Sequence, residues 1–441
     1  MNKIFKCHIV LLLPFLFLLT FSQCGFALIA SPASSHYFLT IADIHFDPFM
    51  ACQQSTIRPC PILEQLRQAP ASEWPAIFKQ YDQSPPRFRQ ETNYALLLPV
   101  LAAAKQVAMM PAGSRKRTGV CPAIESGVTF NKNSLQSGFS APILHETAYQ
   151  LDDTSQPQQP VQFVLVLGDF LAHDFRMYYR KYSLDKSIAG YRAFVLKTLT
   201  FLNQQLAETF PDIDVYSVIG NNDSYQQDYI STPNGPFFKD AGALWASLVK
   251  DKVTRADMQR QFPAAGYYAV TLTPSLRLIV LNSVLFSNKI FDKKIDIAAE
   301  TELTWLQQQL EQANANKQKV MIAMHIPVSI DMVVTGERWF ALMELWQVKY
   351  KLRFEEILRQ FSTELLGVFT GHLHADWNEV IKLPLSTPIT INGTPSVSPI
   401  FGNDPGFKMY QYDLSEKSLD FTTYECASLI AGNRYRISSL F

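Results

Sequence analysis

The chain has 441 residues, of which 47% are hydrophobic and 18% are charged, and its 39 Lys and Arg residues balance 39 Asp and Glu residues. This length and apolar content predict a globular protein with one large core or two modest ones. Because the net charge is zero, we expect no scaffold role on nucleic acid and no strong electrostatic attraction to an anionic membrane.

The N-terminal segment has the pattern of a secretory signal peptide. Lys3 and Lys6 precede a largely apolar run at 9–21, and small residues follow at 25–30, where we expect cleavage. We therefore predict a leader at 1–27, a secreted or periplasmic location, and no stable membrane span after cleavage. The run is shorter than the ~20 residues of a spanning helix, and an uncleaved anchor is the alternative.

Four cysteines remain once the leader is removed: Cys52, Cys60, Cys121 and Cys426. An even number of cysteines in an exported chain predicts disulfides. Three pairings are open, although Cys52 and Cys60 are close enough to close a small loop. Buried free thiols are the alternative.

Short β-branched runs then alternate with amphipathic stretches, which predicts an α/β fold. Strands are expected at 37–42, 161–167, 215–219, 277–281, 320–324, 365–370, 377–382, 409–414 and 419–424. Helices are expected at 187–210, 300–312 and 351–361. We predict a single domain over 31–441, with an insertion at about 110–160 and a strand-rich completion at about 376–441.

Polar motifs directly follow five of the predicted strands, where an α/β sheet presents its functional loops. In chain order they are Asp43-Ile44-His45, Gly168-Asp169-Phe170, Gly220-Asn221-Asn222-Asp223, His325-Ile326-Pro327 and Gly371-His372-Leu373-His374. A single such motif is weak evidence, because a lone histidine after a strand is more often a core residue. All five in order at strand ends predict a metal site.

The residue types in these motifs suit a pair of divalent cations. Two cations about 3.5 to 4 Å apart need a bridging carboxylate and several neutral nitrogen or oxygen donors. A mixture of imidazole and carboxylate favours Zn, with Fe or Mn as alternatives, over Ca or Mg. Glycines at 168, 220 and 371 fit tight turns in which backbone passes close to the metals.

This ordered set resembles the signature of the calcineurin-like metallophosphoesterase superfamily, from about Phe38 to the C-terminus. The resemblance implies a four-layer α/β (α+β) architecture, in which two facing mixed β-sheets are flanked by helices and a dinuclear metal site lies at the sheet ends. It implies that Asp169 bridges the metals. The other implied ligands are Asp43, His45 and His374 for the first metal, and Asn221, His325 and His372 for the second.

The run from Gly168 to Asp174 is similar to that of acid sphingomyelinase-like phosphodiesterases. This narrower resemblance implies that His173 protonates the leaving group, and a histidine that only holds its loop is the alternative. Asn222 stands where related enzymes often carry histidine. It can donate a hydrogen bond to a phosphoryl oxygen, but it cannot transfer a proton.

We therefore expect an exported dinuclear-metal phosphodiesterase, in which a hydroxide that bridges the two ions attacks phosphorus and His173 acts as the acid. Its partner would be a small phosphorylated substrate: a phosphodiester, a nucleotide or a lipid headgroup. Endopolyphosphatase-like relatives also carry an Asn-Asn-Asp run, so hydrolysis of nucleotide or polyphosphate phosphoanhydrides is an alternative. A non-catalytic binding or scaffold protein on the same fold is another. The sequence identifies no protein partner.

Overall fold

The computed structural model describes residues 35–81, 84–111, 121, 160–330 and 343–430. All of them fall within one structural unit, Ser35–Phe441. The predicted leader lies outside the described residues, as does nearly all of the predicted insertion, and both stay predictions. Among the described helices, none combines the length and the apolar character that crossing a membrane requires.

Five strands form the first sheet, in the order β11-β10-β1-β2-β3. Their bounds are β1 His36–Ile41, β2 Val161–Val166, β3 Asp214–Ser217, β10 Gly406–Asp413 and β11 Ser418–Glu425. β1, β2 and β3 run parallel, whereas β10 is antiparallel to both of its neighbours. β1 and β2 are almost wholly buried, as is typical of parallel strands that are covered on both faces.

Six strands form the second sheet, in the order β4-β5-β6-β7-β9-β8. Their bounds are β4 Tyr268–Thr273, β5 Leu276–Val280, β6 Lys319–Ala323, β7 Leu365–Thr370, β8 Trp377–Ile381 and β9 Ile389–Gly393. The four inner strands run parallel and the two edge strands are antiparallel to them. Both sheets are therefore mixed.

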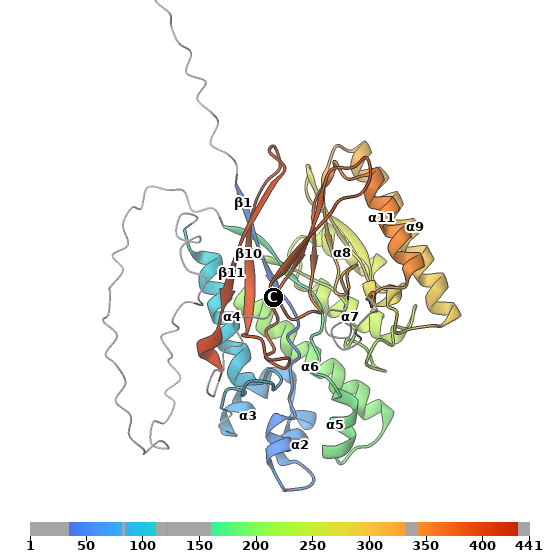
Figure 1. Cartoon of the computed structure of the whole chain (residues 1–441). Helices are drawn as coiled ribbons and strands as arrows, with labels where there is room; N and C mark the ends of the chain where they lie inside the picture. The colour runs from blue at the N-terminus through green and yellow to red at the C-terminus, as the bar shows by residue number, and fades with distance from the viewer. Residues whose placement is uncertain (1–34, 82–83, 112–120, 122–159, 331–342, 431–441) are drawn as a thin grey trace, which may run out of the picture. The chain divides into compact units, whose positions relative to one another are not determined.

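The two sheets face each other, and long helices cover their outer faces (Figure 1). Phe369 of the second sheet packs on Phe38 and Tyr410 of the first, with ring centroids 5.1 and 5.0 Å apart. α4 (Tyr94–Met109) contacts β1 and β10, and α6 (Ile188–Thr209) packs on α4. On the other side α9 (Lys293–Ala315) contacts β5 and β6, and α11 (Val348–Gln360) packs on α9. The predicted four-layer architecture is confirmed.

Several elements differ from the sequence-based expectation. The strands of the predicted C-terminal completion divide between the two sheets, since β8 and β9 extend the second sheet whereas β10 and β11 extend the first. The pattern also predicted neither β4 nor β9, nor several helices. These are α1 Met50–Gln54, α2 Pro61–Gln68, α3 Trp74–Gln80, α4 Tyr94–Met109, α5 Phe175–Tyr182, α7 Pro236–Ala246 and α8 Lys252–Gln261.

Two disulfides settle the pairing that the sequence left open. Cys52 is bonded to Cys60, which closes the loop between α1 and α2. Cys121 is bonded to Cys426, which directly follows β11. All four cysteines that follow the predicted leader are therefore paired in disulfides.

Candidate metal centre

The predicted motifs meet at the carboxyl ends of the parallel strands, where backbone hydrogen bonds join their loops. The amide of Asp43, after β1, donates to the carbonyl of Gly168, and the amide of His45 donates to that of Asp169, at 3.1 and 2.8 Å. In the second sheet the amide of Gly371 donates to the carbonyl of His325 at 3.1 Å. These bonds fix the positions from which the side chains enter the site.

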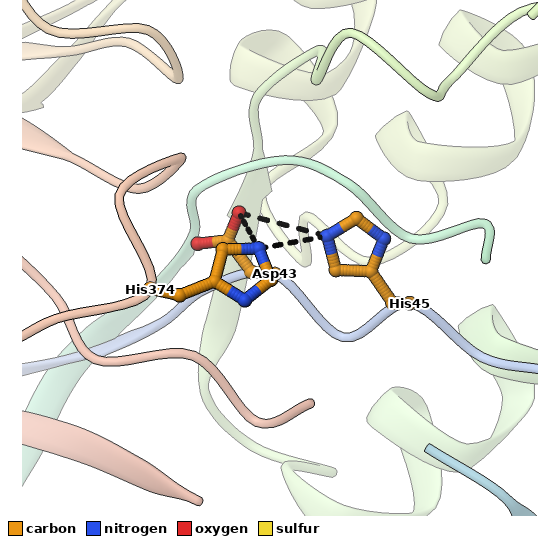
Figure 2. Close-up of side chains that lie close together, drawn as sticks. All are labelled: Asp43, His45 and His374. Atoms are coloured by element: carbon orange, nitrogen blue, oxygen red, sulfur yellow. Dashed lines mark hydrogen bonds and ion pairs between the residues drawn. The ribbon is translucent and has the colours of Figure 1, made fainter. Parts of the chain in front are cut away.

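Asp43, His45 and His374 form the first cluster of candidate ligands (Figure 2). The Nε2 atoms of the two histidines lie 3.1 Å apart. Oδ1 of Asp43 lies 3.9 Å from Nε2 of His45 and 3.5 Å from Nε2 of His374. All three side chains are buried. One oxygen and two nitrogens thus lie close enough together for all three to bind the same cation.

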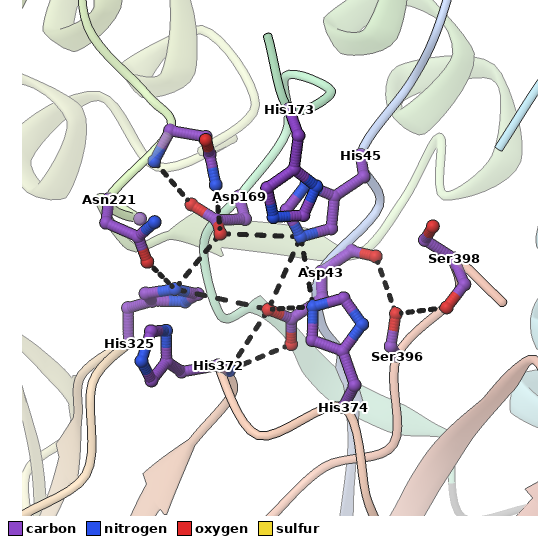
Figure 3. Close-up of polar contacts among 12 residues, drawn as sticks. Asp43, His45, Asp169, His173, Asn221, His325, His372, His374, Ser396 and Ser398 are labelled. Carbon is purple, nitrogen blue, oxygen red and sulfur yellow. Dashed lines mark hydrogen bonds and ion pairs between the residues drawn. The ribbon is translucent and has the colours of Figure 1, made fainter. Parts of the chain in front are cut away.

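Asp169, His325 and Asn221 form the second cluster (Figure 3). Nε2 of His325 lies 3.0 Å from Oδ1 of Asn221 and 3.3 Å from Oδ2 of Asp169. The same Asp169 oxygen lies 3.4 Å from Nε2 of His45, in the first cluster. Asp169 therefore lies close to both clusters, as does Asp43, whose Oδ1 lies 4.0 Å from Nε2 of His325.

His372 is positioned by its backbone as well as by its ring. Its amide donates to both carboxylate oxygens of Asp43, each at 3.0 Å. Its ring centroid lies 5.1 Å from that of His325, and its Nε2 lies 3.5 Å from the hydroxyl of Tyr229. The ring therefore lies beside the second cluster, and its assignment to the second metal stays a prediction.

The chemical state of His45, His372 and His374 suits metal ligation. Nδ1 of His45 and of His325 each lie within hydrogen-bond distance of a backbone carbonyl, at 3.2 and 2.7 Å, so each ring can donate there and aim the Nε2 lone pair at the site. Burial lowers the pKa of His45 to about 4 and that of His372 to about 3. Burial also holds the pKa of His374 well below its usual value. Neutral imidazole is the form that binds a metal. Burial would lower the pKa of His325 as well, but the charges of Asp169 and Asp43 outweigh burial and raise it to about 9, so a metal would have to displace that proton.

The carboxylates carry charge that the protein alone balances poorly. Burial raises the pKa of Asp43 to about 8, against the opposing effect of His325. Burial would raise the pKa of Asp169 as well, but the nearby His325 and His45 outweigh it and hold that pKa well below its usual value. Divalent cations would supply the missing positive charge. The donor set therefore fits two such ions.

Backbone strain is concentrated at the candidate ligands. Five of them have positive φ: Asp43 at 51°, His45 at 43°, Asp169 at 52°, His372 at 72° and His374 at 54°. Each such conformation costs on the order of 1–3 kcal/mol and persists only where its surroundings enforce it. Glycine is required beside them, because a Cβ at Gly220 would lie 2.1 Å from the amide nitrogen of Asp169. Such a cradle is typical of a site built for close ligation.

His173 lies at the edge of the first cluster, with its ring stacked on His45 at a centroid separation of 4.2 Å (Figure 3). Its Nδ1 lies 2.6 Å from Oε1 of Glu91. Burial lowers the pKa of His173, but the hydrogen bond and charge of Glu91 outweigh burial, so the pKa is above its usual value. The ring is partly exposed, whereas those of His45, His325 and His374 are buried. An accessible imidazole whose pKa is raised by a neighbouring carboxylate suits a general acid.

Asn222 contacts Asp169 rather than pointing freely into solvent. Its backbone amide and its side-chain amide donate to the two Asp169 oxygens, each at 2.8 Å. The side-chain amide has a second hydrogen that could donate to a phosphoryl oxygen. That contact stays a prediction. Asp223 accepts from the amides of Phe170, Leu171 and Gly220 and so joins the loops that follow β2 and β3.

Sequence reasoning assigned no role to Asp223 or to Glu91. Asp223 stands inside a predicted motif, and its place two residues after Asn221 was a usable signal. Glu91 follows no predicted strand and belongs to no motif. Its contact with His173 spans 82 residues, so only the folded chain reveals it.

A groove of about 790 Å³ adjoins the second cluster through Tyr229. Residues 228–234, Lys289–Asp292 and the first turns of α9 line it, and we call it the Tyr229 groove. Its apolar rim includes Ile230, Phe291 and Ile297, which are 51%, 82% and 60% exposed. Exposed large apolar side chains beside a polar site are typical of a surface that binds a ligand.

Comparison with known proteins gives the same family as the motifs. Residues 142–376 match the model of the family described as Calcineurin-like phosphoesterase. Cyclic GMP-AMP phosphodiesterase SMPDL3A of Homo sapiens is 27% identical over 242 residues, covering 52% of this chain and 51% of that protein. Sphingomyelin phosphodiesterase A of Dictyostelium discoideum is 27% identical over 225 residues, covering 49% and 36%.

The chain thus spans about half the length, or less, of these curated relatives. Among solved structures, a dimetal phosphatase from Danio rerio aligns with a TM-score of 0.40 and 12% identity, covering 88% of this chain and 99% of that one.

Proposed function

Because the chain belongs to the calcineurin-like phosphoesterase family, we propose that it is a metal-dependent phosphodiesterase. One observation carries the proposal. Side chains from five separate loops converge in two clusters, with an Asp169 oxygen 3.4 Å from His45 and 3.3 Å from His325. A purely structural polar core would not need so many lone-pair donors facing one another. A scaffold protein would have no use for the strained backbone that positions them.

The proposed roles follow from the geometry. Asp43, His45 and His374 would hold one cation, Asn221, His325 and His372 would hold the other, and Asp169 would be shared between them. Divalent cations at such a site activate water and stabilise charge on phosphoryl oxygens. His173 supplies the proton to the leaving oxygen, because its ring faces outward from the first cluster while Glu91 occupies Nδ1. Asn222 keeps Asp169 in place and can donate to a phosphoryl oxygen.

Zinc is the cation that we propose, with iron or manganese as alternatives, because the donors are mainly imidazole nitrogens and carboxylate oxygens. We also propose export through an N-terminal leader. The two disulfides are compatible with an extracytoplasmic location, since such bonds persist in oxidising compartments.

For the substrate we propose a phosphodiester with an organic leaving group. The relatives' names point to a cyclic dinucleotide and to sphingomyelin. The Tyr229 groove favours an organic group over inorganic polyphosphate. Its charged lining residues are Lys289, Lys294, Asp228 and Asp292, so opposite charges offset each other there. A track for a polyanion would need a clear excess of positive charge.

Replacing Phe291 by alanine should raise KM for a phosphodiester with a large aromatic or alkyl leaving group by roughly fivefold, because about 1 kcal/mol of apolar contact is lost. KM for a methyl phosphodiester should stay unchanged. Steady-state kinetics on both esters measure the effect. Leu385→Ala is the matched control, since that side chain is 99% exposed and does not line the groove. Equal KM changes on both esters would show that the groove does not hold the leaving group.

Metal removal tests the activity itself. After treatment with a chelator, hydrolysis of bis(p-nitrophenyl) phosphate should fall to background and return on addition of zinc, manganese or ferrous ion. The restored enzyme should turn over the diester faster than p-nitrophenyl phosphate and faster than polyphosphate. Preference for polyphosphate would favour the phosphoanhydride alternative. Chelator-resistant or negligible turnover of all three compounds would contradict the enzyme proposal.

A further inference from the structure

Glu91 lies next to the candidate acid but is not one of the candidate metal ligands named by the motifs. It precedes α4 by three positions, and it is 8% exposed. Its local backbone is tied to the first motif, since the amide of Asp47 donates to the carbonyl of Thr92 at 2.7 Å. A buried carboxylate needs hydrogen-bond partners to offset its lost solvation. The identity of those partners indicates what Glu91 does.

Both oxygens of Glu91 are engaged, and they contact two different loops. Oε1 lies 2.6 Å from Nδ1 of His173 and accepts from the backbone amide of the same residue at 3.2 Å. Oε2 accepts from the hydroxyl of Ser398 at 2.9 Å. Glu91 thus fixes both the ring and the backbone of His173, and Ser398 fixes Glu91.

Ser398 is in turn part of the frame around Asp43. Its backbone amide donates to the carbonyl of Asp43 at 3.1 Å, and the hydroxyl of Ser396 donates to the same carbonyl at 3.0 Å. Figure 3 shows both serines on the Asp43 side of the cluster, with His173 over His45. A chain of hydrogen bonds therefore runs from the loop that carries a candidate metal ligand, through Ser398 and Glu91, to the candidate acid.

We propose that Glu91 is a positioning residue, which holds the His173 ring by Nδ1 so that Nε2 faces the leaving oxygen of the substrate. The inference rests on the phosphodiesterase function proposed above. A carboxylate bonded to one imidazole nitrogen fixes the orientation of the ring and the nitrogen that meets the substrate. As a water oxygen adds to phosphorus and gives up a proton, the bond between phosphorus and the leaving oxygen breaks. That oxygen takes the proton of His173 Nε2, which solvent then restores.

A competing interpretation makes Glu91 a metal ligand. Glu91, His45 and His173 each offer an atom within 4.8 Å of the others, a spacing compatible with a cation. However, the Nδ1 of His173 that faces Glu91 is only 2.6 Å away, the length of a direct charge-assisted hydrogen bond. Metal content measured on a Glu91 variant separates the two interpretations.

Glu91→Gln is the test, because it keeps the shape of the side chain and removes its charge. We expect kcat for an alkyl phosphodiester, which has a poor leaving group, to fall by on the order of 10–100-fold, within the 10²–10⁴ that general acids contribute. We expect little change in KM, in kcat for bis(p-nitrophenyl) phosphate, or in metal content. In a His173→Gln background the same substitution should add almost nothing, since both act on one proton transfer.

Glu64→Gln is the matched control, because that partly buried carboxylate accepts from Leu184, away from the site. Equal losses on both esters, full additivity with His173→Gln, or loss of a metal would each overturn the positioning role. If Glu91→Gln does not fold, Ser398→Ala replaces it as the test. This variant frees Oε2 of Glu91, and we expect the same pattern of kcat losses, smaller in size. A wild type inactive on both esters would overturn the phosphodiesterase proposal itself.

Discussion

Replacing Asp169 by asparagine should reduce hydrolysis of bis(p-nitrophenyl) phosphate by ~10³-fold or more. The substitution replaces the carboxylate that lies close to both clusters by a neutral amide, which bridges cations poorly. Several kcal/mol of transition-state stabilisation by the metals would be lost, and each 1.36 kcal/mol lowers the rate by a factor of ten. Metal content, measured by elemental analysis on the purified protein, should fall along with activity.

Asp257→Asn is the matched control for that experiment. Asp257 pairs with Arg260 on the surface of α8, and an exposed ion pair of this kind contributes about 0–1 kcal/mol to stability. The control should keep full activity and both metals. Thermal melting of the two variants separates loss of the site from loss of the fold. An Asp169→Asn protein that is folded and retains wild-type turnover would contradict the bridging role and, with it, the two-metal proposal.

The motif residues could be located from the sequence because each follows a strand with a strong local pattern. Asp43 follows the buried run of β1, and His325 follows β6, so the place of each at the carboxyl end of its own strand could be predicted. The two strands belong to different sheets, so only the family resemblance implied that these residues meet. Their occupancy by metal remains a prediction. The strain at Asp43 and His45 could not be predicted, because it results from hydrogen bonds to a loop more than a hundred residues away.

Strand partners and the less regular helices were beyond the local pattern. β10 lies beside β1, with Phe38 opposite Tyr410, and nothing near either residue encodes that pairing. α8 buries only Met258 among its residues, so it has no apolar stripe to predict it. Glu91 shows the same limit at the site, since its function depends on contacts with His173 and Ser398 that are distant in sequence.

His173→Gln should separate substrates by their leaving groups. An alkoxide leaving group needs a proton as the bond to phosphorus breaks, whereas p-nitrophenolate is stable without one. We therefore expect kcat to fall by ~10²–10⁴-fold on an alkyl phosphodiester and by less than about tenfold on bis(p-nitrophenyl) phosphate. Metal content should be unchanged, because His173 stacks on His45 and is not one of the candidate ligands.

The matched control is His36→Gln, at the first position of β1, the opposite end of that strand from the motif. It should behave as wild type on both esters. The dependence of log kcat on the pKa of the leaving group, across a series of aryl and alkyl diesters, gives the sharper measurement. Its slope should become steeper in His173→Gln, because the uncatalysed departure of the leaving group then limits the rate. An unchanged slope with a uniform loss would mean that His173 only holds its loop, and the acid would have to be sought elsewhere in the site.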